Sequence, residues 1–198
     1  MNAKNFISTP GANDERLRIF SVYADFAAAS RIRWASARIA ALASAGREPS
    51  AEMWSVSSVI TTGSLGKIIV QEAAAADLLI VAMSSLDQRE IGLMQWLELL
   101  PVQKKSSASQ GLLIGLFGDD RNQAGELEWA VSQFSRIARE SKMNFIWSWM
   151  AEEVLENADW LTGNVTDYCA RKRRRIHAAN MPAERGGANQ SYPSLIAG

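Results

Sequence analysis

The stretch Asp77–Ser85 constrains the fold of this chain more than any other part of its sequence. It begins with an aspartate, continues as a short uninterrupted apolar run, and ends at two serines. A strand that is covered by helices on both faces has no solvent-exposed side, so its residues do not alternate between apolar and polar. The run therefore predicts a central strand of a parallel sheet. Ser84 and Ser85 would follow its carboxyl end, at the edge where open α/β sheets bind their ligands.

The rest of the first 150 residues alternates between strand-like and helix-like segments. A second continuous apolar run, Gly111–Gly118, predicts another central strand. This alternation favours right-handed crossovers and a parallel sheet, for which we predict the strand order 2-1-3-4-5. Besides the two central strands, the predicted elements are strands at 17–23, 53–60 and 143–150 and helices at 26–44, 65–76, 87–100 (ended by Pro101) and 123–142.

The composition indicates an ordinary globular domain and excludes several classes of protein. Of the 198 residues, 47% are hydrophobic and 21% are charged, and the 21 acidic and 21 basic residues cancel to a formal net charge of zero. A disordered chain would be far less apolar, and no global field draws this chain toward nucleic acid or an anionic membrane. The single cysteine, Cys169, cannot form an intrachain disulfide. Because we find neither a secretory signal nor an apolar run of membrane-spanning length, we expect a cytoplasmic protein.

The C-terminal quarter of the chain differs in character from the rest. It begins with several acidic residues and continues into the basic run Arg171–Arg175. We expect a short helix around Val154, Leu155 and Trp160, and partial disorder over roughly the last 20 residues, which lack periodicity and bulky apolar side chains. The predicted parts of the chain are a flexible arm at 1–15, an α/β domain at 16–150 and a charged extension at 151–198.

Over residues 16–150 this pattern resembles flavodoxins and the receiver domains of response regulators, which implies a three-layer, flavodoxin-like (Rossmann-like) α/β fold. Receivers are known for an acidic pair after strand one, a phosphorylated aspartate that ends strand three, and a lysine that ends strand five. Here Asp25 alone follows the first strand, two serines end the third, and no lysine lies within 146–149. The resemblance therefore implies a receiver-like domain without its phosphoacceptor. The function it favours is a non-catalytic regulatory or protein-interaction domain.

The sequence does not match the phosphate-binding loops that such folds use. A flavodoxin-like FMN site has a Ser/Thr/Gly-rich loop after strand one, because backbone N–H groups at a helix N-terminus hold the phosphate. The corresponding stretch Tyr23–Phe26 has a different composition, so we predict no cofactor. Thr61–Lys67 is the nearest approach to an anion-binding loop. Only two residues separate its glycines and Ile68 follows its lysine, whereas a P-loop has four residues between the glycines and Ser or Thr after the lysine.

Hydroxyl and carboxyl side chains at the predicted strand ends suggest an alternative function, a small-molecule or nucleotide/phosphate-binding enzyme. These side chains would meet because the carboxyl ends of parallel strands share one edge. The same residue types cap helices, and although Asp87 would add a further Mg²⁺ ligand, we predict no metal. The lone histidine, His177, lies far out in the tail, so no serine is expected to have a catalytic base. The candidate ligand-binding residues are Asp25, Thr61, Thr62, Gly63, Ser64, Ser84, Ser85, Asp119 and Asp120.

Aromatic and basic residues predict two further surfaces. Trp147 and Trp149 share one face of the last strand, which is an edge strand in this topology, and exposed indoles there would bind a protein partner of unknown identity. A third function, that of a nucleic-acid accessory protein, would use the basic residues of the tail to contact phosphates. The acidic residues upstream favour a solvated tail instead, and no membrane partner is expected. The basic residues are Arg171, Lys172, Arg173, Arg174 and Arg175.

Overall fold

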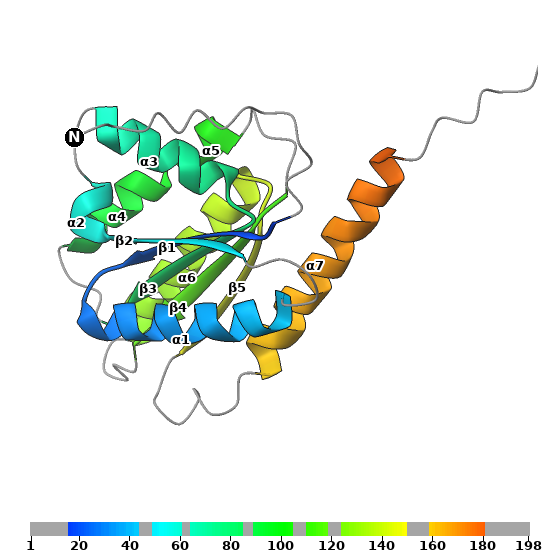
Figure 1. The fold of residues 1–198 in the computed structure, drawn as a ribbon. Helices are drawn as coiled ribbons and strands as arrows, with labels where there is room; N and C mark the ends of the chain where they lie inside the picture. The colour runs from blue at the N-terminus through cyan, green and yellow to red at the C-terminus, as the bar shows by residue number, and fades with distance from the viewer. Residues whose placement is uncertain are drawn as a thin grey trace, which may run out of the picture.

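The computed structural model contains a five-stranded parallel sheet with helices on both faces (Figure 1). The predicted fold class and strand order are confirmed, because the strands lie in the order β2-β1-β3-β4-β5. They are β1 (Arg18–Tyr23), β2 (Ser50–Ser55), β3 (Leu78–Met83), β4 (Leu112–Phe117) and β5 (Asn144–Trp149). The structure describes residues 16–43, 49–60, 64–84, 89–104, 110–118, 124–149 and 159–180. The arm expected at 1–15 and the last residues of the chain lie outside these segments.

The two continuously apolar runs form the centre of the sheet. Every residue of β3 and β4 is buried, and the two strands pair in parallel with Ile80 opposite Ile114. Successive side chains of β3 enter different layers, since Leu79 packs with the helices on one face and Ile80 with those on the other. The edge strands β2 and β5 are mostly exposed or half-buried, and their sequences are correspondingly more polar.

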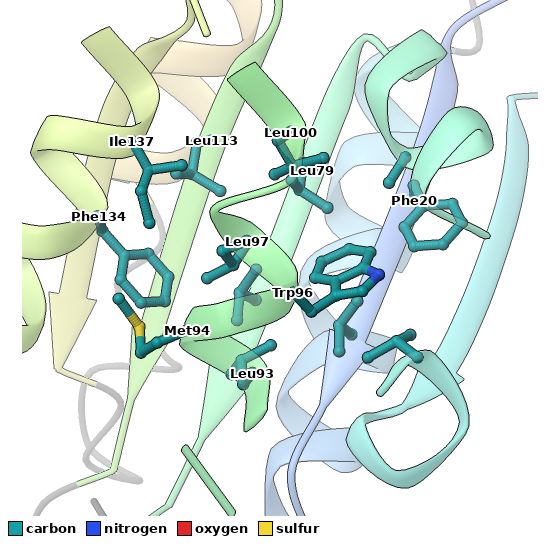
Figure 2. Packing of buried hydrophobic residues seen from close by; sticks show 14 of the residues in the cluster. Phe20, Leu79, Leu93, Met94, Trp96, Leu97, Leu100, Leu113, Phe134 and Ile137 are labelled. Carbon is teal, nitrogen blue, oxygen red and sulfur yellow. The ribbon is translucent and has the colours of Figure 1, made fainter. Parts of the chain in front are cut away.

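Helices cover both faces of the sheet. They are α1 (Phe26–Ala43), α2 (Val56–Val59), α3 (Ser64–Ala75), α4 (Arg89–Leu97), α5 (Leu100–Lys104), α6 (Ala124–Glu140) and α7 (Asp159–Asn180). α1 and α7 pack on one face, and α2 to α6 pack on the other. Between the sheet and α2 to α6, Trp96 of α4 stacks on Phe20 of β1 with ring centroids 6.3 Å apart (Figure 2). Phe134 of α6 meets Phe117 of β4 edge to face.

Two predicted elements, the strand at 53–60 and the helix at 87–100, differ from the structure by more than two residues. The strand predicted at 53–60 ends at Ser55, whose hydroxyl accepts the Ser58 N–H at 3.2 Å and caps α2. Serine at this position supplies an acceptor that the first turn of a helix lacks. Pro101, predicted to end a helix, lies in the first turn of α5. Proline is tolerated there because an N–H in the first turn has no intrahelical acceptor.

The C-terminal helix is longer than the short helix expected at the start of the extension. α7 spans 22 residues, and its Leu161, Val165 and Tyr168 are buried on the face of the sheet that α1 also covers. Val154 and Leu155 lie outside the described residues. The end of α7 extends away from the sheet (Figure 1, orange). Within the described segments, no helix combines the length and the apolar character that crossing a membrane requires.

Polar side chains attach α7 to the amino edge of the sheet, the edge at which the strands begin. Asp77, directly before β3, accepts a hydrogen bond from Lys172 Nζ at 2.7 Å and from the Arg18 N–H at 2.9 Å. The Tyr168 hydroxyl donates to the carbonyl of Gln110, just before β4, at 2.7 Å. α7 is therefore held to the sheet by partly buried polar contacts as well as by its apolar face.

A buried lysine lies near the same edge. Lys104 is only 3% exposed, and its ammonium donates to the carbonyls of Ala74 and Ala76 at the end of α3, at 2.9 and 3.3 Å. Those carbonyls have few partners within their own helix, so the lysine satisfies them. Burial lowers the pKa of Lys104 to about 8, because the charged form loses its hydration, and the nearby Asp77 carboxylate opposes this shift. Lys104 is therefore buried because its ammonium binds the carbonyls at the C-terminal end of α3.

Candidate functional site

Two of the predicted site residues meet at the carboxyl edge of the sheet. Asp25 lies just after β1 and Ser84 just after β3, and these strands are neighbours in the sheet. The chain leaves β1 toward α1 on one face and leaves β3 toward α4 on the other. This is a topological switch point, the place where open α/β sheets have a crevice for ligands.

Asp25 caps α1 and also spans the switch point. Its Oδ1 accepts the Ala28 N–H at 2.9 Å, which satisfies one of the free N–H groups of the first helical turn. The same oxygen accepts the Ser84 hydroxyl at 2.8 Å, and Oδ2 accepts the Ser84 N–H at 3.1 Å. Asp25 was selected from the sequence as a residue at the end of a strand, and the structure assigns it three hydrogen bonds.

Arg31 completes the cluster and was missed by the sequence analysis. From the second turn of α1, its Nη1 donates to Ser84 Oγ at 2.8 Å. The result is a chain of hydrogen bonds in which Arg31 donates to Ser84 and Ser84 donates to Asp25. No signal in its own helix separates Arg31 from the nearby Arg33, because its partner Ser84 lies 53 residues away in the sequence.

The electrostatics of this Asp25–Ser84–Arg31 cluster favour binding over nucleophilic chemistry. Burial alone would raise the pKa of the Asp25 carboxyl, but hydrogen bonds from Ala28 and Ser84 and the charge of Arg31 together place it below its ordinary value. Burial lowers the pKa of the Arg31 guanidinium, and Asp25 opposes this effect. A carboxylate with a lowered pKa is a weak base, so it does not activate the Ser84 hydroxyl as a nucleophile.

Gly118 fixes Ser84 from the side of β4. Its N–H donates to the carbonyl of Met83 at 2.7 Å, which extends the pairing of the two strands past their ends. A Cβ atom at position 118 would lie 2.2 Å from the carbonyl oxygen of Ser84 and 2.7 Å from its Cα. Only glycine permits this approach, which places the backbone of Ser84 directly against the end of β4.

Most of the other predicted ligand-binding residues lie outside the described segments. Ser64 is the first residue of α3. Among the residues that the structure describes, no group of His, Cys, Asp or Glu side chains has the arrangement of a metal site. The predicted residues outside the described segments are Thr61, Thr62, Gly63, Ser85, Asp119 and Asp120, and Asp87 lies outside them as well.

The two other predicted surfaces are only partly accessible. Trp147 is 39% exposed and packs edge to face with Phe117 and Trp149, whereas Trp149 is half-buried against the core. Within the basic run, Lys172 is paired with Asp77, and its neighbours in the run are exposed. A protein partner at the tryptophans and a nucleic-acid contact at the arginines stay predictions.

Similarity to solved structures supports the fold. The chain is similar to an oxidoreductase from Corynebacterium diphtheriae, with a TM-score of 0.59 and 10% identity over 79% of this chain and 98% of that one. It is similar to a short-chain flavodoxin associated with a non-canonical PDU bacterial microcompartment, with a TM-score of 0.50 and 12% identity over 77% and 99% of the two chains. It is also similar to an NADH:FMN oxidoreductase in its apo form, with a TM-score of 0.51 and 14% identity over 80% and 89%. No protein-family model and no curated protein matches the sequence.

These similarities confirm the flavodoxin-like fold and correct the function expected from the sequence. The prediction of a non-catalytic regulatory or protein-interaction domain depended on the receiver resemblance. That prediction is wrong, because the similar structures are oxidoreductases and a flavodoxin, and none of the three is a receiver. The alternative of a protein that binds a small molecule at the carboxyl edge agrees better with them.

The residues after β1 do not fit the FMN phosphate that a flavodoxin-like fold implies. Such a phosphate would accept N–H groups at the N-terminus of α1. In this chain the carboxylate of Asp25 accepts the N–H of Ala28 and lies at that position itself. A phosphate would be placed beside a carboxylate that is hydrogen-bonded on both oxygens, where like charges repel.

Proposed function

We propose that this chain is a redox protein that binds a small organic ligand at the carboxyl edge of its sheet, above the ends of β1 and β3. The observation that carries the proposal is the Asp25–Ser84–Arg31 cluster at the switch point. A guanidinium, a hydroxyl and a carboxylate that converge on rigid elements are typical of a small-molecule site. The fold shared with two oxidoreductases and a flavodoxin supports a redox role.

Arg31 and Phe26 are the residues we expect to contact the ligand. A guanidinium has five N–H donors in a planar fork, and the hydrogen bond that Arg31 makes to Ser84 engages one of its terminal nitrogens. The rest of the fork suits a carbonyl or carboxylate of the ligand. Phe26 directly follows Asp25 and is 80% exposed, so its ring offers a planar apolar surface at the same edge.

A binding screen on the purified full-length chain tests the proposal. We would record its visible absorbance for bound flavin and measure thermal stabilisation by riboflavin, FMN, FAD, NADH and NADPH. We expect at least one of these compounds to raise the melting temperature. We expect Arg31→Gln and Phe26→Ala each to weaken its binding about tenfold, which corresponds to one lost charge-assisted hydrogen bond or ring contact.

The matched control is Arg33→Gln. Arg33 is an exposed arginine on the same helix, and its substitution should leave the affinity unchanged. The proposal fails if no compound stabilises the protein. It also fails if Arg31→Gln binds the stabilising compound as tightly as the wild type does, because the ligand would then lie elsewhere.

A further inference from the structure

We infer that Asp25 is a specificity residue that excludes phosphate from the N-terminus of α1, so that this edge selects ligands without a phosphate at that position. The inference depends on the proposed function for the statement that this edge binds a ligand. The ligand class that remains is an uncharged ring system, or one that presents a carbonyl or carboxylate to Arg31.

The N–H groups at the start of α1 are the groups that a phosphate would bind. The first turn of a helix presents N–H groups without intrahelical acceptors and a partial positive charge, and it therefore attracts anions. In this chain the anion is part of the protein, since Asp25 Oδ1 accepts the Ala28 N–H at 2.9 Å. A phosphate would have to compete for the same N–H group with an acceptor that is covalently attached next to it.

The carboxylate of Asp25 is held in place by hydrogen bonds to both of its oxygens. Its two oxygens accept the hydroxyl and the N–H of Ser84 in addition to the Ala28 N–H. The Ser84 backbone is itself held by the close approach of Gly118. Moving Asp25 aside would break hydrogen bonds to two separate elements, so a ligand that displaced it would leave the Ala28 and Ser84 N–H groups without this acceptor. Its lowered pKa keeps it ionised at neutral pH.

The Asp25–Ser84–Arg31 cluster holds one negative and one positive side chain. Arg31 lies next to Ser84, and its charge interacts with that of Asp25. The pair is neutral overall, whereas a site for a phosphomonoester needs a surplus of positive charge or of N–H donors. One nitrogen of the guanidinium therefore serves the Ser84 hydroxyl, which in turn donates to Asp25, and what remains suits a neutral or singly charged group.

Three proteins test the inference with inorganic phosphate as the probe. In the wild type, the charged carboxylate of Asp25 occupies the N-terminus of α1. In Asp25→Asn an uncharged side chain of the same size occupies it. In Asp25→Ser the smaller side chain leaves room there, and its hydroxyl can still cap the helix. We expect phosphate to leave the melting temperature of the wild type unchanged. For Asp25→Ser we expect the melting temperature to rise by about 3 °C when phosphate is present at ten times its dissociation constant. The rise for Asp25→Asn should be smaller than for Asp25→Ser.

Asp159→Ser is the matched control. Asp159 is an exposed aspartate in the first turn of α7, so its substitution removes the same charge from another helix start, and phosphate should not stabilise that variant. The inference is overturned if phosphate stabilises the wild type. It is equally overturned if Asp25→Ser and Asp25→Asn, verified as folded by circular dichroism, both respond to phosphate as the wild type does.

A second measurement separates this inference from the proposed function. We would compare riboflavin with FMN, which differ by the terminal phosphate. If the wild type binds flavin, we expect FMN to bind no more tightly than riboflavin, and Asp25→Ser to shift the ratio toward FMN about tenfold. A wild type that prefers FMN tenfold would overturn the inference and leave the proposed function intact. Failure of every redox compound to bind would remove the proposed function, and the phosphate series would still decide the role of Asp25.

Discussion

Asp77 and Asp25 are aspartates at opposite edges of one sheet, and their surroundings differ. The Asp77 side chain is 5% exposed and pairs directly with Lys172 at 2.7 Å. Asp25 is half-buried, and Arg31 reaches it through the hydroxyl of Ser84. The amino edge therefore pairs its carboxylate directly with an ammonium. At the carboxyl edge, the contact described for the guanidinium engages one terminal nitrogen, and the proposed ligand would use the others.

The largest effect is expected at the most crowded point of the carboxyl edge. Gly118→Ala should destabilise the fold by about 3 kcal/mol, because the new Cβ would overlap the Ser84 backbone and force β3 and β4 apart. Chemical denaturation measures the change. The control is Gly125→Ala in α6, where a Cβ meets nothing within 4 Å and stability should stay the same or rise. Equal small changes in the two variants would show that this end of the sheet is not rigid.

At the amino edge, Lys172→Met should cost about 2 kcal/mol, because it leaves the buried carboxylate of Asp77 without its counter-charge. This is less than for a fully buried pair, since Lys172 is partly solvated. Arg173→Met, one position along the same helix and exposed, should change stability by less than about 0.5 kcal/mol. Similar losses of stability in Lys172→Met and Arg173→Met would mean that Lys172 does not stabilise the buried carboxylate of Asp77. The contrast between the two edges would then weaken.

The buried lysine makes stability depend on pH in a way that the carboxyl edge does not. The pKa of Lys104 is about 8 in the folded protein and near 10.5 in an unfolded chain, so the unfolded state binds more protons between these values. Stability should therefore rise with pH across this window, by about 1.5 kcal/mol from pH 8 to 9.5. Urea titrations at several pH values measure it. Lys104→Met should lose this rise, and a wild-type curve that is flat or falling would contradict the interpretation.

The smallest effect is expected for the cap of α1. Asp25→Ala should cost about 1 kcal/mol, because the Ala28 N–H loses its acceptor, whereas Asp25→Asn keeps an acceptor and most of the stability. The pKa of Asp25 is lowered in the folded protein, so its charged form adds stability at neutral pH. That part is lost as the pH falls below about 4. The free energies of unfolding of the wild type and Asp25→Asn, measured as the pH is lowered, should converge.

The sequence predicted the sheet well because burial is encoded locally. A continuous apolar run indicates a strand covered on both faces, and Asp77–Ser85 and Gly111–Gly118 contain the central strands β3 and β4. The sequence misread Val56–Val59, since a short helix capped by Ser55 has the same residue types as a strand. It also missed the length of α7, whose buried face is set by contact with α1 and the sheet.

The candidate site was only half predictable. Asp25 and Ser84 were selected because each follows a predicted strand, and strand ends share an edge in a parallel sheet. Arg31 was overlooked because nothing in its own helix distinguishes it from Arg33, and its partner is distant in the sequence. The function inferred from the receiver resemblance was wrong because receivers and flavodoxins share one strand order, so the pattern alone does not separate them.

The sequence by itself determined most of the strands and helices, which strands lie in the centre, and which residue types stand at the strand ends. These properties follow from periodicity over a few neighbouring residues. The tertiary structure alone decided which of those side chains meet. Ser84 lies 53 residues from Arg31 and 59 from Asp25, and Lys172 lies 95 residues from Asp77. Such contacts depend on strand order and helix placement, because a side chain cannot specify a distant partner until the sheet brings the two together.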